Sequence, residues 1–157
     1  MIHIIQGDLL ASDCTVIAHQ CNCFSTMGAG IAKQIAEKYP QALQADKNFP
    51  YPPEERLGKI SIAYNDQQPL VIYNLYAQYR YEPGKRHTDY AALKSALNMM
   101  FANIRVNRDA LFQFPIKIGL PFGMGAGLAG GDWDIIYAII DDMALKYETD
   151  VYLYRLH

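Results

Sequence analysis

Short apolar runs alternate with amphipathic stretches along the chain, and these two patterns predict strands and helices respectively. The apolar runs are rich in β-branched and aromatic residues and end at glycine, polar or acidic residues. The amphipathic stretches repeat apolar residues every three or four positions. The predicted strands are residues 2–6, 15–19, 59–64, 70–76, 115–120 and 149–155. The predicted helices are residues 31–39, 41–48, 89–103 and 132–146.

The order of these elements predicts the fold class. Strands and helices mostly alternate, and residues 59–64 and 70–76 form a hairpin in the middle. This order predicts a single domain over residues 1–157 with an α/β fold, a three-layer α/β/α sandwich around a mixed, mostly parallel sheet. Ligands of such folds bind beyond the carboxyl ends of the strands. Two glycine-containing loops follow predicted strands, so we expect both loops on that edge.

Composition narrows the classes of partner. The 157 residues carry a formal net charge of −2, so no overall basic field favours nucleic acid, which is not an expected partner. No run of about 18 apolar residues predicts a membrane span, and the first residues lack a signal-peptide pattern. The odd number of cysteines, Cys14, Cys21 and Cys23, argues against a disulfide framework and favours a reducing, cytoplasmic setting.

The glycine-rich stretch at residues 123–131 carries the clearest chemical signal. Five glycines fall within nine residues, just before a predicted helix. Free backbone N–H groups and a helix N-terminus suit an anion, above all a phosphate or diphosphate. No Gly-Lys-Ser/Thr follows, and the late position in the chain disfavours a dinucleotide-dependent oxidoreductase. A plain turn between strand and helix is the structural alternative.

The loop at residues 20–30 is the second candidate binding segment. The amide of Asn22 can bind a ribose hydroxyl, or it can simply cap the loop. Gly28 and Gly30 allow close approach to a sugar or phosphate, just before the predicted helix at Ile31. The nearby thiols of Cys21 and Cys23 are more typical of inert buried cysteines than of nucleophiles.

His19 and Asp132 are the candidate catalytic residues, and each has a structural alternative. His19 is either a general base or a buried histidine with satisfied hydrogen bonds. Asp132 either caps the last predicted helix or orients a water near the ligand. No cluster of metal-ligand residues appears in the sequence, so neither a metal nor a cofactor is expected.

Together these motifs resemble those of a macrodomain, the ADP-ribose-binding fold. The resemblance extends over nearly the whole chain, and the first loop is most similar to yeast-type ADP-ribose 1″-phosphate phosphatases and to terminal ADP-ribose protein glycohydrolases. The matching segments are Gly7-Asp8-Leu9-Leu10, His19-Gln20-Cys21-Asn22-Cys23, Gly28-Ala29-Gly30-Ile31-Ala32, Tyr39-Pro40-Gln41-Ala42, Tyr73-Asn74-Leu75 and residues 123–133.

The resemblance implies which residues would meet each part of the ligand. That ligand would be ADP-ribose or ADP-ribose 1″-phosphate, with ADP-ribosylated protein as a further partner. The adenine would be met by Asp8, Leu9, Tyr154 and Leu156. The distal ribose would be held by Asn22, Gly28, Ala29 and Gly30, with Ile31 beside them. The diphosphate would be wrapped by Gly123, Met124, Gly125, Ala126 and Gly127, with Leu128 beside them.

Two departures from the glycohydrolase pattern bear on mechanism. That branch attacks the distal ribose with a lysine placed shortly after the fourth strand, where this chain has Gln78. It also has an aspartate directly after the Gly-Leu of its second loop, where this chain has Ala129. The resemblance therefore favours hydrolysis of ADP-ribose 1″-phosphate, with His19 or Asp132 as acid or base. A non-catalytic ADP-ribose-binding module and a protein ADP-ribosyl glycohydrolase remain the alternatives.

Overall fold

A computed structural model describes residues 1–82, 84–109 and 114–156. Within these ranges one six-stranded sheet has the order β1-β6-β5-β2-β4-β3. Neighbouring strands pair in parallel except for β3 and β4, which form the predicted antiparallel hairpin. The strands are β1 (Ile2–Gln6), β2 (Val16–Cys21), β3 (Ile60–Asn65), β4 (Leu70–Tyr76), β5 (Ile118–Pro121) and β6 (Val151–Arg155).

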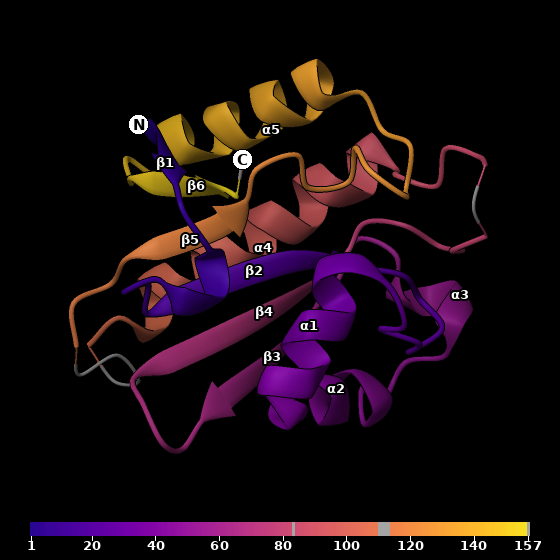
Figure 1. The fold of residues 1–157 in the computed structure, drawn as a ribbon, viewed down its shortest axis with the longest axis horizontal. Helices are drawn as coiled ribbons and strands as arrows, with labels where there is room; N and C mark the ends of the chain where they lie inside the picture. The colour runs from indigo at the N-terminus through magenta and orange to yellow at the C-terminus, as the bar shows by residue number, and fades with distance from the viewer. Residues whose placement is uncertain (83, 110–113, 157) are drawn as a thin grey trace.

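Helices cover both faces of this sheet (Figure 1). The helices α1 (Gly30–Lys38) and α2 (Pro40–Lys47) lie on one face, and α4 (Tyr90–Asn107) and α5 (Trp133–Lys146) lie on the other. The described residues also form two short elements, the 3-10 helix η1 (Leu9–Ala11) and α3 (Pro53–Arg56). The predicted three-layer α/β/α sandwich with a mixed, mostly parallel sheet is confirmed. No helix in the described ranges is long and apolar enough to cross a membrane.

The central strand β2 divides the core in two. Successive strand residues point to opposite faces, so Val16 and Ala18 join the core under α4 and α5, while Ile17 joins the core under α1 and α2. The helical stripes predicted from periodicity are buried as expected. They are Leu93, Leu97, Met100 and Ile104 on α4, and Ile136, Ile140 and Met143 on α5.

The structure differs from the sequence-based expectations at several elements, three of which have a clear local cause. The short helix α3 was not predicted and begins at Pro53, because proline and acidic residues favour a first helical turn. The unpredicted helix η1 begins after Asp8, whose carboxylate accepts from the Leu10 N–H. Strand β5 starts at Ile118 instead of residue 115, since the Lys117 N–H donates to the Thr15 hydroxyl instead of a strand carbonyl.

Candidate functional site

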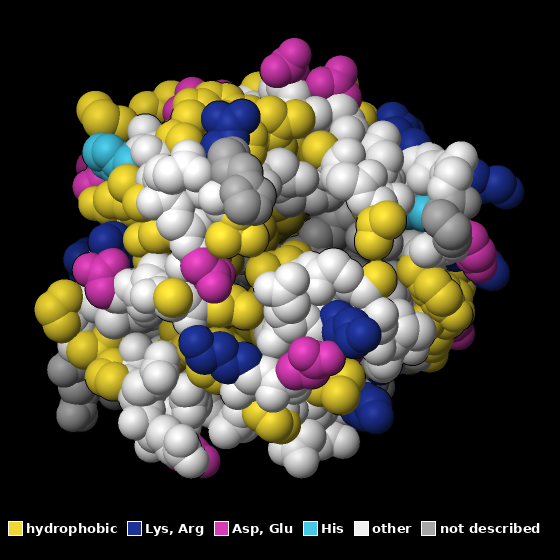
Figure 2. Space-filling view, viewed as in Figure 1, with side chains coloured by type: hydrophobic (Ala, Val, Ile, Leu, Met, Phe, Trp, Pro, Cys, Tyr) yellow, Lys and Arg dark blue, Asp and Glu magenta, His cyan; other side chains and the backbone are white. Residues whose placement is uncertain are grey.

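A cavity of about 560 Å³ opens at the carboxyl ends of β2 and β5, within the range of roughly 300–1,000 Å³ typical of small-molecule sites. Figure 2 shows this face of the molecule hollowed near its centre. The two glycine-containing loops expected on one edge of the sheet therefore line one cavity. The first loop and α1 supply Asn22, Thr26, Met27, Gly28, Ala29, Gly30, Ile31 and Ala32, and the second loop supplies Phe122, Gly123, Met124, Gly125, Gly127, Leu128 and Ala129.

The second loop offers free backbone donors to this cavity. Gly123 and Gly125 have φ values of 80° and 78°, a left-handed conformation that favours glycine. Among the described residues, the N–H groups of Gly123, Gly125 and Gly127 donate to no protein acceptor. Unpaired N–H groups in a glycine-rich turn are the usual donors to bound phosphates. The arrangement suits the predicted anion cradle.

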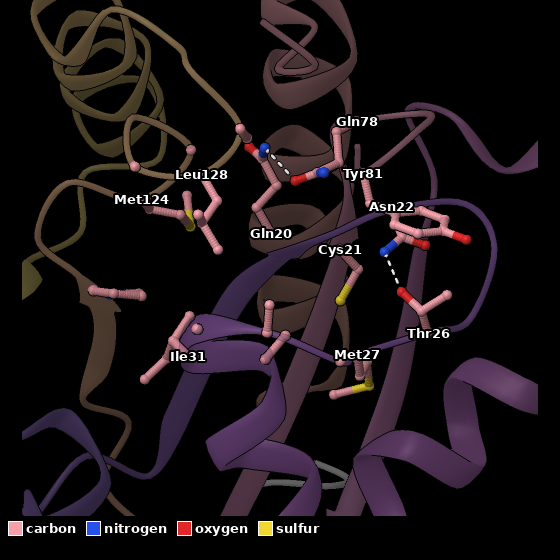
Figure 3. A pocket seen from close by; sticks show the side chains of 18 of the residues that line it. Gln20, Cys21, Asn22, Thr26, Met27, Ile31, Gln78, Tyr81, Met124 and Leu128 are labelled. Carbon is pink, nitrogen blue, oxygen red and sulfur yellow. Dashed lines mark hydrogen bonds between the residues drawn. The ribbon is translucent and has the colours of Figure 1, made fainter. Parts of the chain in front are cut away.

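Asn22 shapes the first loop and also lines the cavity. Its Nδ2 donates to Thr26 Oγ1 at 2.7 Å, and its Oδ1 accepts from the Phe24 N–H at 2.8 Å. Figure 3 shows this pair at one side of the cavity and Met124 and Leu128 at the other. The loop-capping alternative for Asn22 is thus confirmed, and its place in the wall leaves the proposed ribose contact open.

A buried ion pair supports the first loop from behind. Arg56 Nη1 lies 3.4 Å from Asp46 Oδ1 and donates to Ser25 Oγ at 2.6 Å. Burial raises the pKa of Asp46, against the opposing effects of Tyr76, Ser25 and Arg56. Ser25 and Met27 have φ values of 58° and 37°, which are unfavourable for residues other than glycine. The ion pair therefore holds a strained segment, and Asp46 is itself part of the cavity wall.

His19 is fully buried and lies outside the cavity wall. Its Nε2 is 2.7 Å from Asn74 Oδ1, and burial lowers its pKa to about 4, so the ring is neutral near pH 7. The adjacent Cys21 thiol does line the cavity, but burial raises its pKa, which keeps it protonated and unreactive. These features match the hydrogen-bonded structural histidine and disfavour His19 as a general base.

We expect His19→Gln to remove part of the pH dependence of folding stability. The pKa of His19 falls from 6.5 to about 4 on folding, so the unfolded state takes up a proton first as the pH drops. In the wild type, His19 should therefore lower the free energy of unfolding by up to about 3 kcal/mol as the pH falls from 6.5 to 4. Urea unfolding across that range measures the effect. Equal pH slopes for the variant and the wild type would contradict it.

Asp132 caps α5 and is likewise outside the cavity wall. Its carboxylate accepts from the Asp134 N–H at 2.9 Å, and its own N–H donates to the Tyr90 hydroxyl at 3.0 Å. The side chain is exposed. Of the two interpretations of Asp132, the structure supports the helix cap and does not bring the carboxylate to the cavity.

None of the four residues expected to meet adenine is part of the cavity wall. Asp8 is exposed and caps η1, Leu9 is buried, and Leu156 is 57% exposed. Tyr154 is buried next to Cys14, and its carbonyl accepts from the N–H of the wall residue Phe122 at 2.9 Å. In the second loop, Ala126 packs against the core under α4 and α5 instead of lining the cavity.

Several wall residues were not predicted as binding residues. Gln20 and Cys21 fall in the candidate segment 20–30 but were not singled out as ligand contacts, and the structure places both at the end of β2. Asp46 carries no local signal, since its burial depends on Arg56 from another segment. Within the described chain, the wall has no Lys, Arg or His side chain. The full set of unpredicted wall residues is Gln20, Cys21, Thr26, Met27, Ala32, Asp46, Gln78, Tyr81, Pro121, Phe122 and Ala129.

Comparison with known proteins identifies relatives with similar sequences. No family model matches the chain. The chain is 33% identical over 153 residues to an uncharacterised 17.5 kDa protein of Enterobacteria phage T4 from the tk–vs intergenic region, covering 94% of this chain and 93% of that protein. It is 27% identical over 161 residues to a DNA ADP-ribosyl glycohydrolase of Mycobacterium tuberculosis, covering 98% of this chain but only 42% of that relative. A segment of 39 residues, 24% of this chain, is 51% identical to 19% of an ADP-ribose 1″-phosphate phosphatase of Aspergillus oryzae.

Solved structures share the fold over almost the whole chain. The macrodomain of Thermus aquaticus DarG superposes with a TM-score of 0.77 at 21% identity, covering 99% of this chain and 98% of that one. Thermosipho africanus DarTG in complex with ADP-ribose gives 0.77 at 17% identity, covering 98% of this chain and 41% of that one. The chain therefore has the macrodomain fold. Through its identity with the phage T4 protein, it belongs to the same family as that protein.

Proposed function

We propose that this protein binds ADP-ribose or a close derivative in the cavity between its two loops. The observation that carries this proposal is one cavity that joins the free N–H groups of the glycine-rich loop to the polar first loop. The diphosphate would lie along Gly123, Gly125 and Gly127. The distal ribose would lie toward Asn22 and the start of α1, and the adenine toward Tyr154. The ADP-ribose complex of the Thermosipho relative supports this choice of ligand.

Isothermal titration calorimetry tests the binding proposal. We expect ADP-ribose to bind at least about tenfold more tightly than AMP, because AMP lacks the second phosphate and the distal ribose. The glycine-rich loop and the first loop would then contribute their full binding free energy only to ADP-ribose, the longer ligand. Equal affinities would place the ligand elsewhere on the molecule, and an absence of binding would remove ADP-ribose as the ligand.

Hydrolysis of ADP-ribose 1″-phosphate is the second candidate function. The segment similar to the Aspergillus phosphatase favours it, as does Gln78, whose amide cannot form an imine with a ribose carbon as a lysine amine can. Glycohydrolysis of ADP-ribosylated substrates by a lysine adduct is correspondingly disfavoured. A hydrolase acting on the distal ribose would use water, with Asp132 or His19 as the acid–base candidates to test, although neither reaches the cavity wall.

An assay of phosphate release from ADP-ribose 1″-phosphate distinguishes a phosphatase from a non-catalytic binding module. Release by the wild type that is lost in Asp132→Ala, with ADP-ribose affinity retained, would support an enzyme that depends on Asp132. No release by the wild type would leave a binding module. Release that survives in Asp132→Ala would support an enzyme that does not use this carboxylate.

The proposed function also includes a cellular compartment and a macromolecular partner. We infer one domain over residues 1–157, acting in the cytoplasm, where its three free cysteines would stay reduced. ADP-ribosylated protein is the macromolecular partner that we propose, since the net charge of −2 gives no overall basic field for nucleic acid. The mycobacterial relative is named for ADP-ribosylated DNA, so a DNA-linked ADP-ribose is the substrate to compare with the protein-linked one.

A further inference from the structure

Gln20 places a buried amide oxygen without a partner in the cavity wall. The residue is only 8% exposed, and among the described residues its Oε1 has no hydrogen-bond partner. Buried polar atoms without partners are rare in native proteins, and those that occur in a binding cavity are candidates for contact with a ligand. This oxygen can only accept, so the missing group is a hydrogen-bond donor.

The neighbours of Gln20 determine the orientation of its side-chain amide. Gln78 donates its own Nε2 to the Arg80 carbonyl at 2.8 Å, and Thr88 donates its hydroxyl to the Gly125 carbonyl at 2.7 Å. The oxygens of Gln78 and Thr88 are therefore left as acceptors, and Gln20 Nε2 donates to both at 2.9 Å. A flipped amide would set oxygen against two acceptors. The amide is thus held in one orientation, with Oε1 turned away from these two partners.

Gln20 Oε1 lies against the glycine-rich loop of the cavity wall. It faces Gly125, where an added Cβ would approach it to 2.7 Å. Figure 3 shows the Gln20 amide between Gln78 and the loop that carries Met124 and Leu128. A second buried oxygen without a partner in the described chain, Asp46 Oδ2, belongs to the same wall. This surface offers acceptors and no cationic side chain.

We propose that Gln20 Oε1 accepts a hydrogen bond from a hydroxyl of the ligand's distal sugar and so determines which sugar the cavity selects. The inference rests on the proposed ADP-ribose binding. A sugar hydroxyl can donate, whereas an ionised phosphate oxygen at the same point would meet a second acceptor. Gln20 is then a specificity-determining residue that touches the ligand. Gln78 and Thr88 are positioning residues, because they act by orienting Gln20.

Calorimetry with ADP-ribose and with three analogues, each lacking one hydroxyl of the distal ribose, tests this role. On the wild type, we expect one analogue to bind about fivefold to tenfold more weakly than ADP-ribose, the effect of one lost hydrogen bond. Gln20→Met keeps a side chain of similar length without the acceptor. It should bind ADP-ribose and that analogue with equal affinity. The matched control Gln34→Met, at an exposed position of α1 outside the wall, should preserve the wild-type difference.

The possible failures of the two proposals are distinct. If the wild type does not bind ADP-ribose, the proposed function fails. If the wild type binds all three analogues as tightly as ADP-ribose, Gln20 does not select a hydroxyl, and this result needs no variant. If Gln20→Met keeps the full wild-type preference for ADP-ribose over the weak analogue, the donor is recognised by another residue. In the last two cases ADP-ribose binding itself stands.

Discussion

Gly125→Ala should weaken ADP-ribose binding by at least about a hundredfold, close to 3 kcal/mol. An added Cβ at this position would lie 2.7 Å from Gln20 Oε1 and 3.2 Å from Ile136 Cδ1. Neither the packed core nor the doubly held amide can yield easily, so the glycine-rich loop must move. Its free N–H groups would then lose the positions that a diphosphate needs, and small displacements in a preorganised site are costly. Titration calorimetry measures the loss.

Gly84→Ala is the matched control for this substitution. Gly84 has a φ of 88°, close to the 78° of Gly125, so both variants carry the left-handed strain of about 1–2 kcal/mol. Among the described residues other than its chain neighbours, none has a heavy atom within 4 Å of a Cβ at Gly84, and Gly84 is outside the wall. It should lose stability but not affinity. If Gly125→Ala binds ADP-ribose as tightly as Gly84→Ala does, the glycine-rich loop does not hold the ligand.

Arg56→Met should destabilise the fold by about 3–5 kcal/mol near pH 7, the usual effect of removing one partner of a buried ion pair. The carboxylate of Asp46 would stay buried without its cation, and Ser25 would lose its donor. Because Ser25 and Met27 hold strained backbone at the cavity, we also expect weaker ADP-ribose binding. Urea unfolding and calorimetry measure the two effects.

The loss in Arg56→Met should shrink as the pH falls from about 7 toward 4. Burial raises the pKa of Asp46 in the folded state, and removing Arg56 takes away an opposing effect. The folded variant therefore binds this proton more tightly than the unfolded chain, so acidification favours folding relative to the wild type. Arg80→Met, which breaks the exposed pair with Glu82, is the control and should change stability little at either pH. Similar losses in both variants would show that the buried pair does not support the fold.

The sequence predicts those parts of the site that are marked by residues with a strong local conformational preference, such as glycine. Five glycines before a helix, and Gly28 and Gly30 before another, mark backbone that can approach a ligand wherever the chain places it. Asn22 in a polar loop is a similar local signal. Gln20 carries no such local signal. The end of β2 places it at the cavity, where Gln20 and Cys21 pair with Leu75 and Tyr76 of β4. That pairing is tertiary and leaves no trace in the neighbouring residues.

The roles of the two catalytic candidates could not be predicted from the local sequence either. The sequence offers a structural and a functional interpretation for His19 and for Asp132, and nothing local decides between them. The hydrogen bond of His19 to Asn74 comes from a separate strand. The loop before Asp132 closes through the Gly131 N–H, which donates to the Gly125 carbonyl at 2.8 Å. These contacts, one between strands and one within the glycine-rich loop, hold His19 in the core and Asp132 at the start of α5, outside the cavity wall.

The position of β2 between β4 and β5 has a consequence for how the protein is made. The first loop is synthesised early, the glycine-rich loop that faces it across the cavity is synthesised only after β5, and β6 follows later still. No nascent chain can present the finished cavity before then. A ligand of this cavity would therefore bind only the completed native state. It would lower the rate of unfolding and would not raise the rate of the earlier folding steps.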